Sequence, residues 1–159
     1  MASDLTVRFE KGARGCRVEA WRRTGKPFPV STMGGAVGLP HDLVTFVVER
    51  ELGLGVGFFN LTAHGAIFRS SRRRFTRPGR ALVAAHRADL DAAEGTVNAA
   101  AADWKAGRPT RTARALDEAE RARAALPRGG ALELIWRTLP LPGRERDRAR
   151  GKERVRAAR

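Results

Sequence analysis

The sequence predicts an α+β fold in which an N-terminal β-hairpin or small sheet with a buried helix is followed by an antiparallel helical hairpin and a disordered basic tail. Three observations predict this class. Residues alternate between apolar and polar near the N-terminus, an almost wholly apolar helical segment follows, and the second half is rich in Ala with heptad spacing. The chain has 159 residues and 42% hydrophobic content, which suits a folded core.

A β-hairpin is predicted at the N-terminus. Leu5, Val7 and Phe9 alternate with polar residues, and after KGARG the run CRVEAW alternates again. The next segment, GKPFPVSTMGGAVG, is too rich in Gly and Pro for a long element, although PFPV is compatible with a short edge strand. Its glycines match neither phosphate-binding pattern, GxGxxG or GxxxxGK[ST]. We therefore expect a small sheet followed by a loop.

A buried helix is predicted from about Pro40 to Leu52, because Pro is tolerated in a first helical turn and Gly53 provides a C-terminal stop. Apolar residues cover most of its circumference. The remaining side gathers a polar stripe made of His41, Asp42, Thr45 and Glu49. The following GVGFFNLTAHGAIF is expected to form a short helix or turn that packs beside this helix.

The polar stripe has two interpretations. A helical zinc site needs two imidazoles one turn apart, usually with a third ligand from elsewhere. His41 and Glu49 are two turns apart, about 12 Å along the axis, so only a weak metal site of His41, Glu49 and His64 is conceivable. In the structural interpretation, Asp42 stabilises the helix N-terminus, while Thr45 and Glu49 form hydrogen bonds with a neighbouring loop. We predict no metal and no other cofactor.

Two long helices are predicted next. Over residues 79–106, apolar residues recur every seven positions, at Val83, Leu90, Val97 and Trp104, and His86, Ala93 and Ala100 follow the first three by three positions. Gly107 and Pro109 end this helix. A returning helix has a stripe of Ala115, Ala119, Ala122 and Leu126. The run ALELIWRTLP fits one more short helix, and the charged tail beyond Pro142 is expected to be disordered when free.

These elements suggest four segments. They are an α+β unit over 1–68, an Arg-rich connector over 69–80, a helical hairpin plus a short helix packed on the first unit over 81–142, and a basic tail over 143–159. The single Cys16 cannot form an intramolecular disulfide, and no window approaches the roughly 18 consecutive apolar residues of a membrane span. We therefore expect a cytoplasmic protein without a membrane span.

Charge is the strongest compositional signal. The 31 basic and 17 acidic residues give a net charge of +14, which favours anionic partners, chiefly nucleic acid or an acidic protein. Most basic residues are Arg, which compositional bias of a genome also produces. Position argues for binding, because the run RSSRRRFTRPGR has six arginines and no acid, and the tail has eight basic residues against three acidic ones. Together these two segments supply 11 of the 14 excess charges.

The Arg-rich run is the candidate nucleic-acid interface. Its residues are Arg69, Arg72, Arg73, Arg74, Phe75, Arg77 and Arg80. Arginines form bidentate contacts with phosphates, and an aromatic ring among them is suited to stacking on an unpaired base. The alternative is that this run is an Arg-rich, solvated connector between the two halves of the fold.

No enzyme class is indicated by the sequence. Cys16 lies in a strand pattern with no assigned base, and the Ser residues lack GxSxG or SxxK surroundings. The favoured hypothesis is a small basic binding protein without catalytic activity. Two alternatives are a metal-associated or degenerate hydrolase-like site on the helix of His41, and a protein-interaction adaptor that uses the helical hairpin.

The segments LPHDL, FVVERELGL, GF and AHGAIF carry a resemblance. Together they resemble a group of small uncharacterised bacterial proteins with a pattern near LPHDLxHFxVExxLGL followed by GFxxxxAxGxxF. The resemblance covers about residues 5–68 and implies a shared fold, without an established activity. Thr45 stands where the pattern tends to have a second His, so a metal site built on this stripe would lack its second imidazole.

Overall fold

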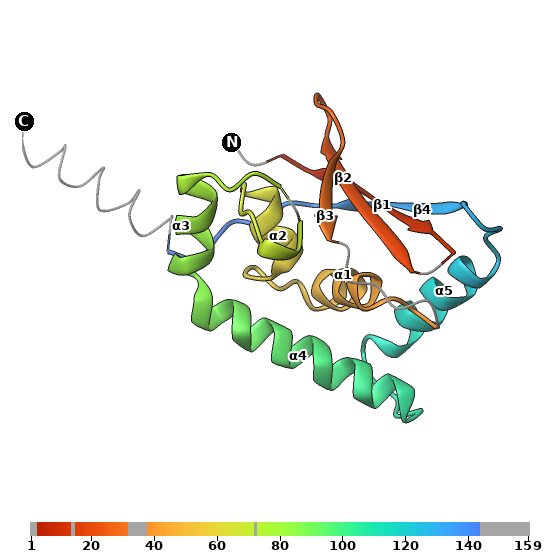
Figure 1. The fold of residues 1–159 in the computed structure, drawn as a ribbon. Helices are drawn as coiled ribbons and strands as arrows, with labels where there is room; N and C mark the ends of the chain where they lie inside the picture. The colour runs from red at the N-terminus through yellow and green to blue at the C-terminus, as the bar shows by residue number, and fades with distance from the viewer. Residues whose placement is uncertain (1–2, 14, 32–37, 72, 144–159) are drawn as a thin grey trace, which may run out of the picture.

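The structure, a computed structural model, describes residues 3–13, 15–31, 38–71 and 73–143 (Figure 1). It confirms the α+β class. The four strands are β1 (Leu5–Lys11), β2 (Cys16–Arg22), β3 (Phe28–Ser31) and β4 (Ala131–Trp136), and they form one antiparallel sheet in the order β3-β2-β1-β4. The helix α1 (His41–Leu52) packs on this sheet, and two later helices pack on α1.

The predicted hairpin is confirmed as β1 and β2, whose pairing runs from Leu5 opposite Arg22 to Lys11 opposite Cys16. The alternating pattern corresponds to the two faces of the sheet, because the apolar positions are buried and the polar positions between them are more exposed. The short edge strand predicted at PFPV is also confirmed, since β3 pairs with β2.

The short helix predicted for ALELIWRTLP is wrong, because this segment forms strand β4 on the free edge of β1. The spacing of its apolar residues fits both the period of a helix and the period of a strand. As a strand, Leu132, Leu134 and Trp136 point to the core, where Trp136 is only 1% exposed, whereas Ile135 is left 52% exposed. Pairing with β1 from Leu5 to Glu10 outweighs the helical pattern.

The buried helix is confirmed as α1. Pro40 precedes it in an extended conformation, and Gly53 ends it at φ 64°, a left-handed conformation that favours Gly. A short helix, α2 (Phe58–Ala63), follows as expected. Phe46 of α1 packs against Phe59 and Trp136 at ring-centroid distances of 5.0 and 5.5 Å, so α1, α2 and β4 share one aromatic core.

The second half contains a short 3₁₀ helix, η1 (Arg69–Ser71), and three α-helices, α3 (Arg77–Ala85), α4 (Arg87–Lys105) and α5 (Ala113–Ala124). The single helix predicted over 79–106 is wrong at one point, because the chain leaves helical geometry at His86, with φ −117° and ψ 21°. No Gly or Pro marks this break in the sequence.

Helices α4 and α5 both pack against α1, as Figure 1 shows. On α4 the predicted seam is partly confirmed, since Ala93 and Val97 are buried and Leu90 is half-buried. On α5 the predicted stripe is partly confirmed, since Ala115 and Ala119 are half-buried against the core. Ala122 is exposed instead, and Leu116, which was not in the stripe, is fully buried.

Strand β4 comes from the second half of the chain but completes the sheet of the first, and the division into segments stays a prediction. The basic tail from residue 144 onward lies outside the described residues. Within the described ranges, no helix is long and apolar enough to cross a membrane.

Candidate functional site

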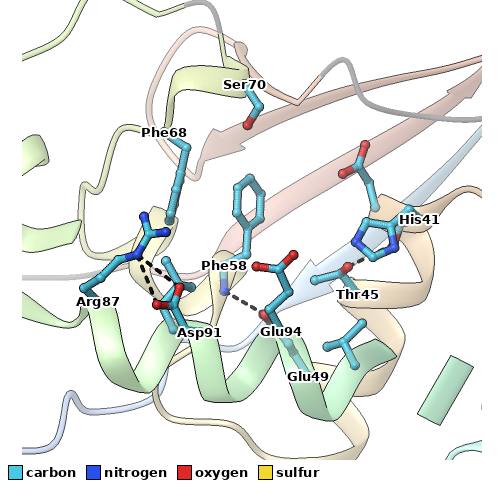
Figure 2. A pocket seen from close by; sticks show the side chains of 12 residues that line it. His41, Thr45, Glu49, Phe58, Phe68, Ser70, Arg87, Asp91 and Glu94 are labelled. Carbon is cyan, nitrogen blue, oxygen red and sulfur yellow. Dashed lines mark hydrogen bonds and ion pairs between the residues drawn. The ribbon is translucent and has the colours of Figure 1, made fainter. Parts of the chain in front are cut away.

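A cavity of about 250 Å³ lies between the polar stripe of α1 and the facing side of α4 (Figure 2). All four residues of the stripe line it. The complete lining is His41, Asp42, Thr45, Glu49, Phe58, Phe68, Ser70, Arg87, Leu90, Asp91, Glu94 and Val97. We call this space the α1–α4 cavity.

The stripe residues differ in their environment. His41 is exposed at the rim, whereas Asp42 and Glu49 are 7% and 2% exposed. The hydroxyl of Thr45 donates to the carbonyl of His41 at 2.9 Å, so it bonds within its own helix. The expectation that Thr45 bonds a neighbouring loop is therefore wrong, while for Glu49 a neighbouring segment does provide the partners.

Glu49 anchors the start of α2. Its Oε1 accepts the N–H of Phe58 at 2.6 Å, and its Oε2 accepts the N–H of Phe59 at 3.0 Å. Gly57 allows this approach, because a Cβ at that position would lie 2.5 to 2.7 Å from the three carboxyl atoms. Burial raises the pKa of Glu49 to about 7, although the two backbone hydrogen bonds act in the opposite direction.

The opposite wall of the α1–α4 cavity comes from α4 and from two phenylalanines. Arg87 forms an ion pair with Asp91 at 3.0 Å, and Glu94 lies one turn further along. The rings of Phe58 and Phe68 lie against one another, with centroids 4.4 Å apart and an interplanar angle of 34°. None of these residues was a predicted site residue. Asp91 and Glu94 flank the Leu90 and Val97 seam, and only the packing of α4 on α1 brings them to the stripe.

The weak metal set is not brought together. His64 does not line the α1–α4 cavity, since its Nε2 lies 2.8 Å from the carbonyl of Leu139. His41 and Glu49 share the cavity at different depths. In the part of the chain that the structure describes, no group of three His, Cys, Asp or Glu side chains could hold a metal ion.

Three of the predicted nucleic-acid-binding residues, Arg69, Phe75 and Arg80, do meet in one surface groove. This groove has a volume of about 790 Å³ and lies along η1 and α3. Its other lining residues are Ile67, Phe68, Ser70, Val83, Ala84 and Arg87. Phe75 is 42% exposed, and the Arg80 guanidinium carbon lies 5.9 Å from the centre of its ring. We call this site the basic groove.

Arg73 points elsewhere. Its guanidinium carbon lies 4.2 Å from the ring centre of Phe28, on β3, and that of Arg22 lies 5.7 Å from the same ring. Desolvation, followed by the charge of Arg22, lowers the pKa of Arg73. Arg74 and Arg77 are exposed beside the basic groove without lining it, and Arg72 lies outside the described residues.

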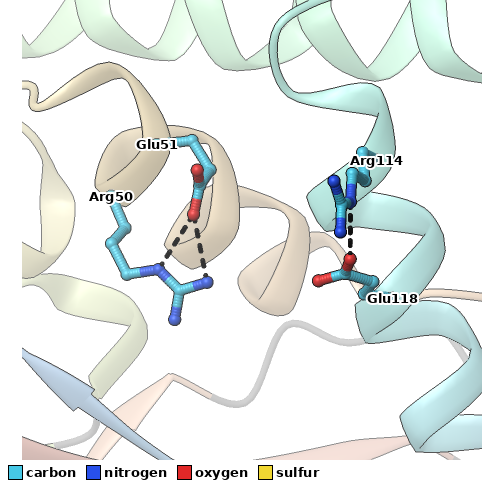
Figure 3. A network of polar contacts seen from close by, with 4 residues as sticks. All are labelled: Arg50, Glu51, Arg114 and Glu118. Carbon is cyan, nitrogen blue, oxygen red and sulfur yellow. Dashed lines mark hydrogen bonds and ion pairs between the residues drawn. The ribbon is translucent and has the colours of Figure 1, made fainter.

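Four arginines of the predicted interface differ from several arginines elsewhere in the chain, which have carboxylate partners. Elsewhere, exposed arginines lie beside carboxylates, as Figure 3 shows for Arg50 with Glu51 at 3.2 Å and for Arg114 with Glu118 at 2.9 Å. By contrast, among the described residues no carboxylate lies within 4.0 Å of the charged atoms of four interface arginines, Arg69, Arg74, Arg77 and Arg80. Within the described part of the chain, their charge is therefore not compensated by a neighbouring carboxylate.

Comparisons with known proteins give no assignment. No protein-family model, no curated protein and no solved structure matches this chain significantly.

Proposed function

We propose that this protein binds single-stranded nucleic acid through the basic groove, without catalysing a reaction. The observation that carries the proposal is an exposed aromatic ring, Phe75, in one concave surface with Arg69 and Arg80, neither of which has a carboxylate partner among the described residues. This combination of a stacking platform and phosphate-binding cations is typical of single-strand binding proteins.

Phe75 supports the stacking component. A large apolar side chain is ordinarily buried, yet 42% of this residue is exposed, and an Arg guanidinium lies near the ring. An unpaired base has a flat surface that can cover such a ring, and the apolar groove residues Ile67, Phe68 and Val83 extend the contact. A duplex keeps its bases stacked inside, so it cannot use this platform.

The arginines support the phosphate component. The basic groove is lined by Arg69, Arg80 and Arg87, and no carboxylate is among the described residues that line it. Arg87 is bonded to Asp91 and is the least available of the three. Arg74 and Arg77 are close in sequence to the groove residue Phe75 and are exposed, so they add positive charge available to a polyanion. The net charge of +14 would add long-range attraction for a polyanion.

The test measures binding of a fluorescently labelled oligouridylate by anisotropy over a series of salt concentrations. Phe75→Ala is expected to weaken binding at least about fivefold, because base stacking on an aromatic ring contributes about 1–3 kcal/mol per base. The double variant Arg69→Gln, Arg80→Gln is expected to reduce the log-log salt slope by about 1.4, because each phosphate that an arginine neutralises on a single strand contributes roughly 0.7 to the slope.

The matched control is Arg111→Gln, Arg128→Gln, which removes the same charge at two exposed positions flanking α5, at the opposite end of the molecule from α3 (Figure 1). This control should leave most of the salt slope intact. Equal slopes for the two double variants would mean that only overall charge attracts the strand. That result, or tighter binding to a duplex than to the single strand, would overturn the proposal.

A further inference from the structure

We propose that the α1–α4 cavity binds a small organic cation, namely a primary amine attached to a compact apolar body. The cavity shares Phe68, Ser70 and Arg87 with the basic groove, but it is lined by carboxyl groups that the groove lining does not include. The inference does not depend on nucleic-acid binding. It rests on the shape of the cavity, on its aromatic wall and on the sign of its charges.

The aromatic and aliphatic wall would hold the apolar body. Phe58 and Phe68 lie ring to ring at 4.4 Å, and Leu90 and Val97 of α4 complete this wall. An ammonium group near the face of an aromatic ring is attracted by the ring's electron density, which is how proteins recognise many organic cations. The apolar wall therefore favours a ligand that is both cationic and partly hydrophobic.

The polar wall would hold the amine. Four carboxyl groups line the α1–α4 cavity, on Asp42, Glu49, Asp91 and Glu94. Among its described lining residues the basic side chains are Arg87, which already bonds Asp91, and His41 at the rim. Within the described residues, no basic side chain lies within 4.0 Å of the Glu94 carboxylate. A cavity so lined attracts a cation even though the whole chain carries a charge of +14.

Glu49 adds a buried acceptor at the inner end of the cavity. Each of its carboxylate oxygens accepts one backbone N–H, whereas an ionised carboxylate has about four acceptor positions. A primary ammonium has three donors, and it could therefore bond a second carboxylate and the ionised form of Glu49, which predominates above about pH 7. Hydrogen bonds between charged groups of this kind are among the strongest in proteins.

The size and the charge exclude other classes of ligand. A volume of about 250 Å³ lies just below the usual range for small-molecule sites, about 300–1,000 Å³, so the ligand must be compact. An anion would be repelled by the carboxylates of the lining. A metal ion would find no group of three suitable ligands among the described residues, and it would leave the aromatic wall unused.

The test is a titration of the full-length protein with 2-phenylethylamine hydrochloride, followed by amide chemical shifts in NMR. The neutral isostere 2-phenylethanol is the comparison ligand, because it differs only in having a hydroxyl in place of the ammonium group. We expect saturable shifts at residues lining the α1–α4 cavity, and binding of the amine about tenfold or more tighter than that of the alcohol.

Two variants locate the site. Glu94→Gln removes one exposed carboxylate of the cavity and should weaken amine binding about threefold, as is common for an exposed ion pair. Its matched control is Glu120→Gln, the same exchange at an exposed position of α5 outside the cavity. Thr45→Phe should abolish binding by filling the cavity, since the Thr45 hydroxyl bonds only its own helix and can be spared.

The inference is overturned if the alcohol binds as tightly as the amine, because the cavity would then select for apolar character alone. It is also overturned if neither ligand shifts the cavity residues, or if Glu94→Gln and Glu120→Gln weaken binding equally. The oligouridylate assay is performed separately, so failure of either proposal leaves the other unaffected.

Discussion

The buried carboxylate of Glu49 should make the stability of this protein depend on pH. In the folded chain, burial raises its pKa from an ordinary value of 4.5 to about 7. Between these two values the folded state keeps a proton that the unfolded state has lost. Because the folded state then binds more protons, the free energy of unfolding must fall as pH rises through this window.

The magnitude follows from the two pKa values. The rise from 4.5 to about 7 corresponds to roughly 3 kcal/mol, at about 1.4 kcal/mol for each pKa unit. The stabilising contribution is fully present below about pH 4.5, decreases as the pH rises toward 7, and is absent above it. Removing the titration by Glu49→Gln should remove this component of the pH dependence, whatever the substitution does to stability at any one pH.

The assay is urea unfolding of both proteins at several values between pH 4.5 and pH 8.5. The difference in unfolding free energy, wild type minus Glu49→Gln, should fall by up to about 3 kcal/mol across this range. The other ionisable groups that line the cavity with Glu49 are His41 and Asp42 of α1 and Arg87, Asp91 and Glu94 of α4. They are present in both proteins, so their effects largely cancel in the difference. The exchange Glu120→Gln, at an exposed position of α5 outside the cavity, serves as the matched control. A flat difference for Glu49→Gln would refute the reasoning, since it would mean that Glu49 titrates as an ordinary surface carboxylate.

Two further predictions concern close packing and reactivity. Gly57→Ala should cost about 1–3 kcal/mol of unfolding free energy in urea melts, because the new methyl group would displace the carboxylate of Glu49 from its two hydrogen bonds. The control Gly95→Ala, in open space on α4, should instead stabilise by about 0.5–1 kcal/mol, and equal effects of the two would contradict the role of Gly57. Cys16 is buried, and desolvation raises the pKa of its thiol to about 11, so it should react with a thiol reagent at pH 8 only after unfolding. Rapid labelling of the native protein would show that β2 opens readily.

The sequence was most informative where a local signal agreed with the tertiary environment. Helix α1 had a start signal at Pro40, a stop at Gly53 and apolar residues around most of its circumference, and all of these were confirmed. The β-hairpin had a clear period of two that matched one buried and one exposed face. In these elements the residues themselves determine conformation and burial.

The sequence failed where partners distant in the chain decide the structure. The six residues of β4 fit a helix as well as a strand, and the free edge of β1 decided between them. The Ala-rich run before Gly107 gave no sign of the break at His86, because Ala suits a helix at every position. The α1–α4 cavity could not be predicted from the sequence either, since Asp91 and Glu94 reach the stripe only through the packing of two helices that are far apart in sequence.

The polar stripe of α1 shows why such a pattern is ambiguous even when its geometry is predicted correctly. In sequence, His41, Asp42, Thr45 and Glu49 form one uniform feature, and a metal site or a structural edge would each explain it. In the structure these four side chains have different contacts. Thr45 satisfies its own helix, Glu49 holds the start of α2, and Asp42 and His41 face the cavity at different depths. A buried helix needs polar residues wherever a neighbouring backbone requires an acceptor, and a ligand site forms beside them only if the next element leaves space. Here α4 leaves that space and adds two more carboxylates, so the case for binding rests on the facing helix as much as on the stripe.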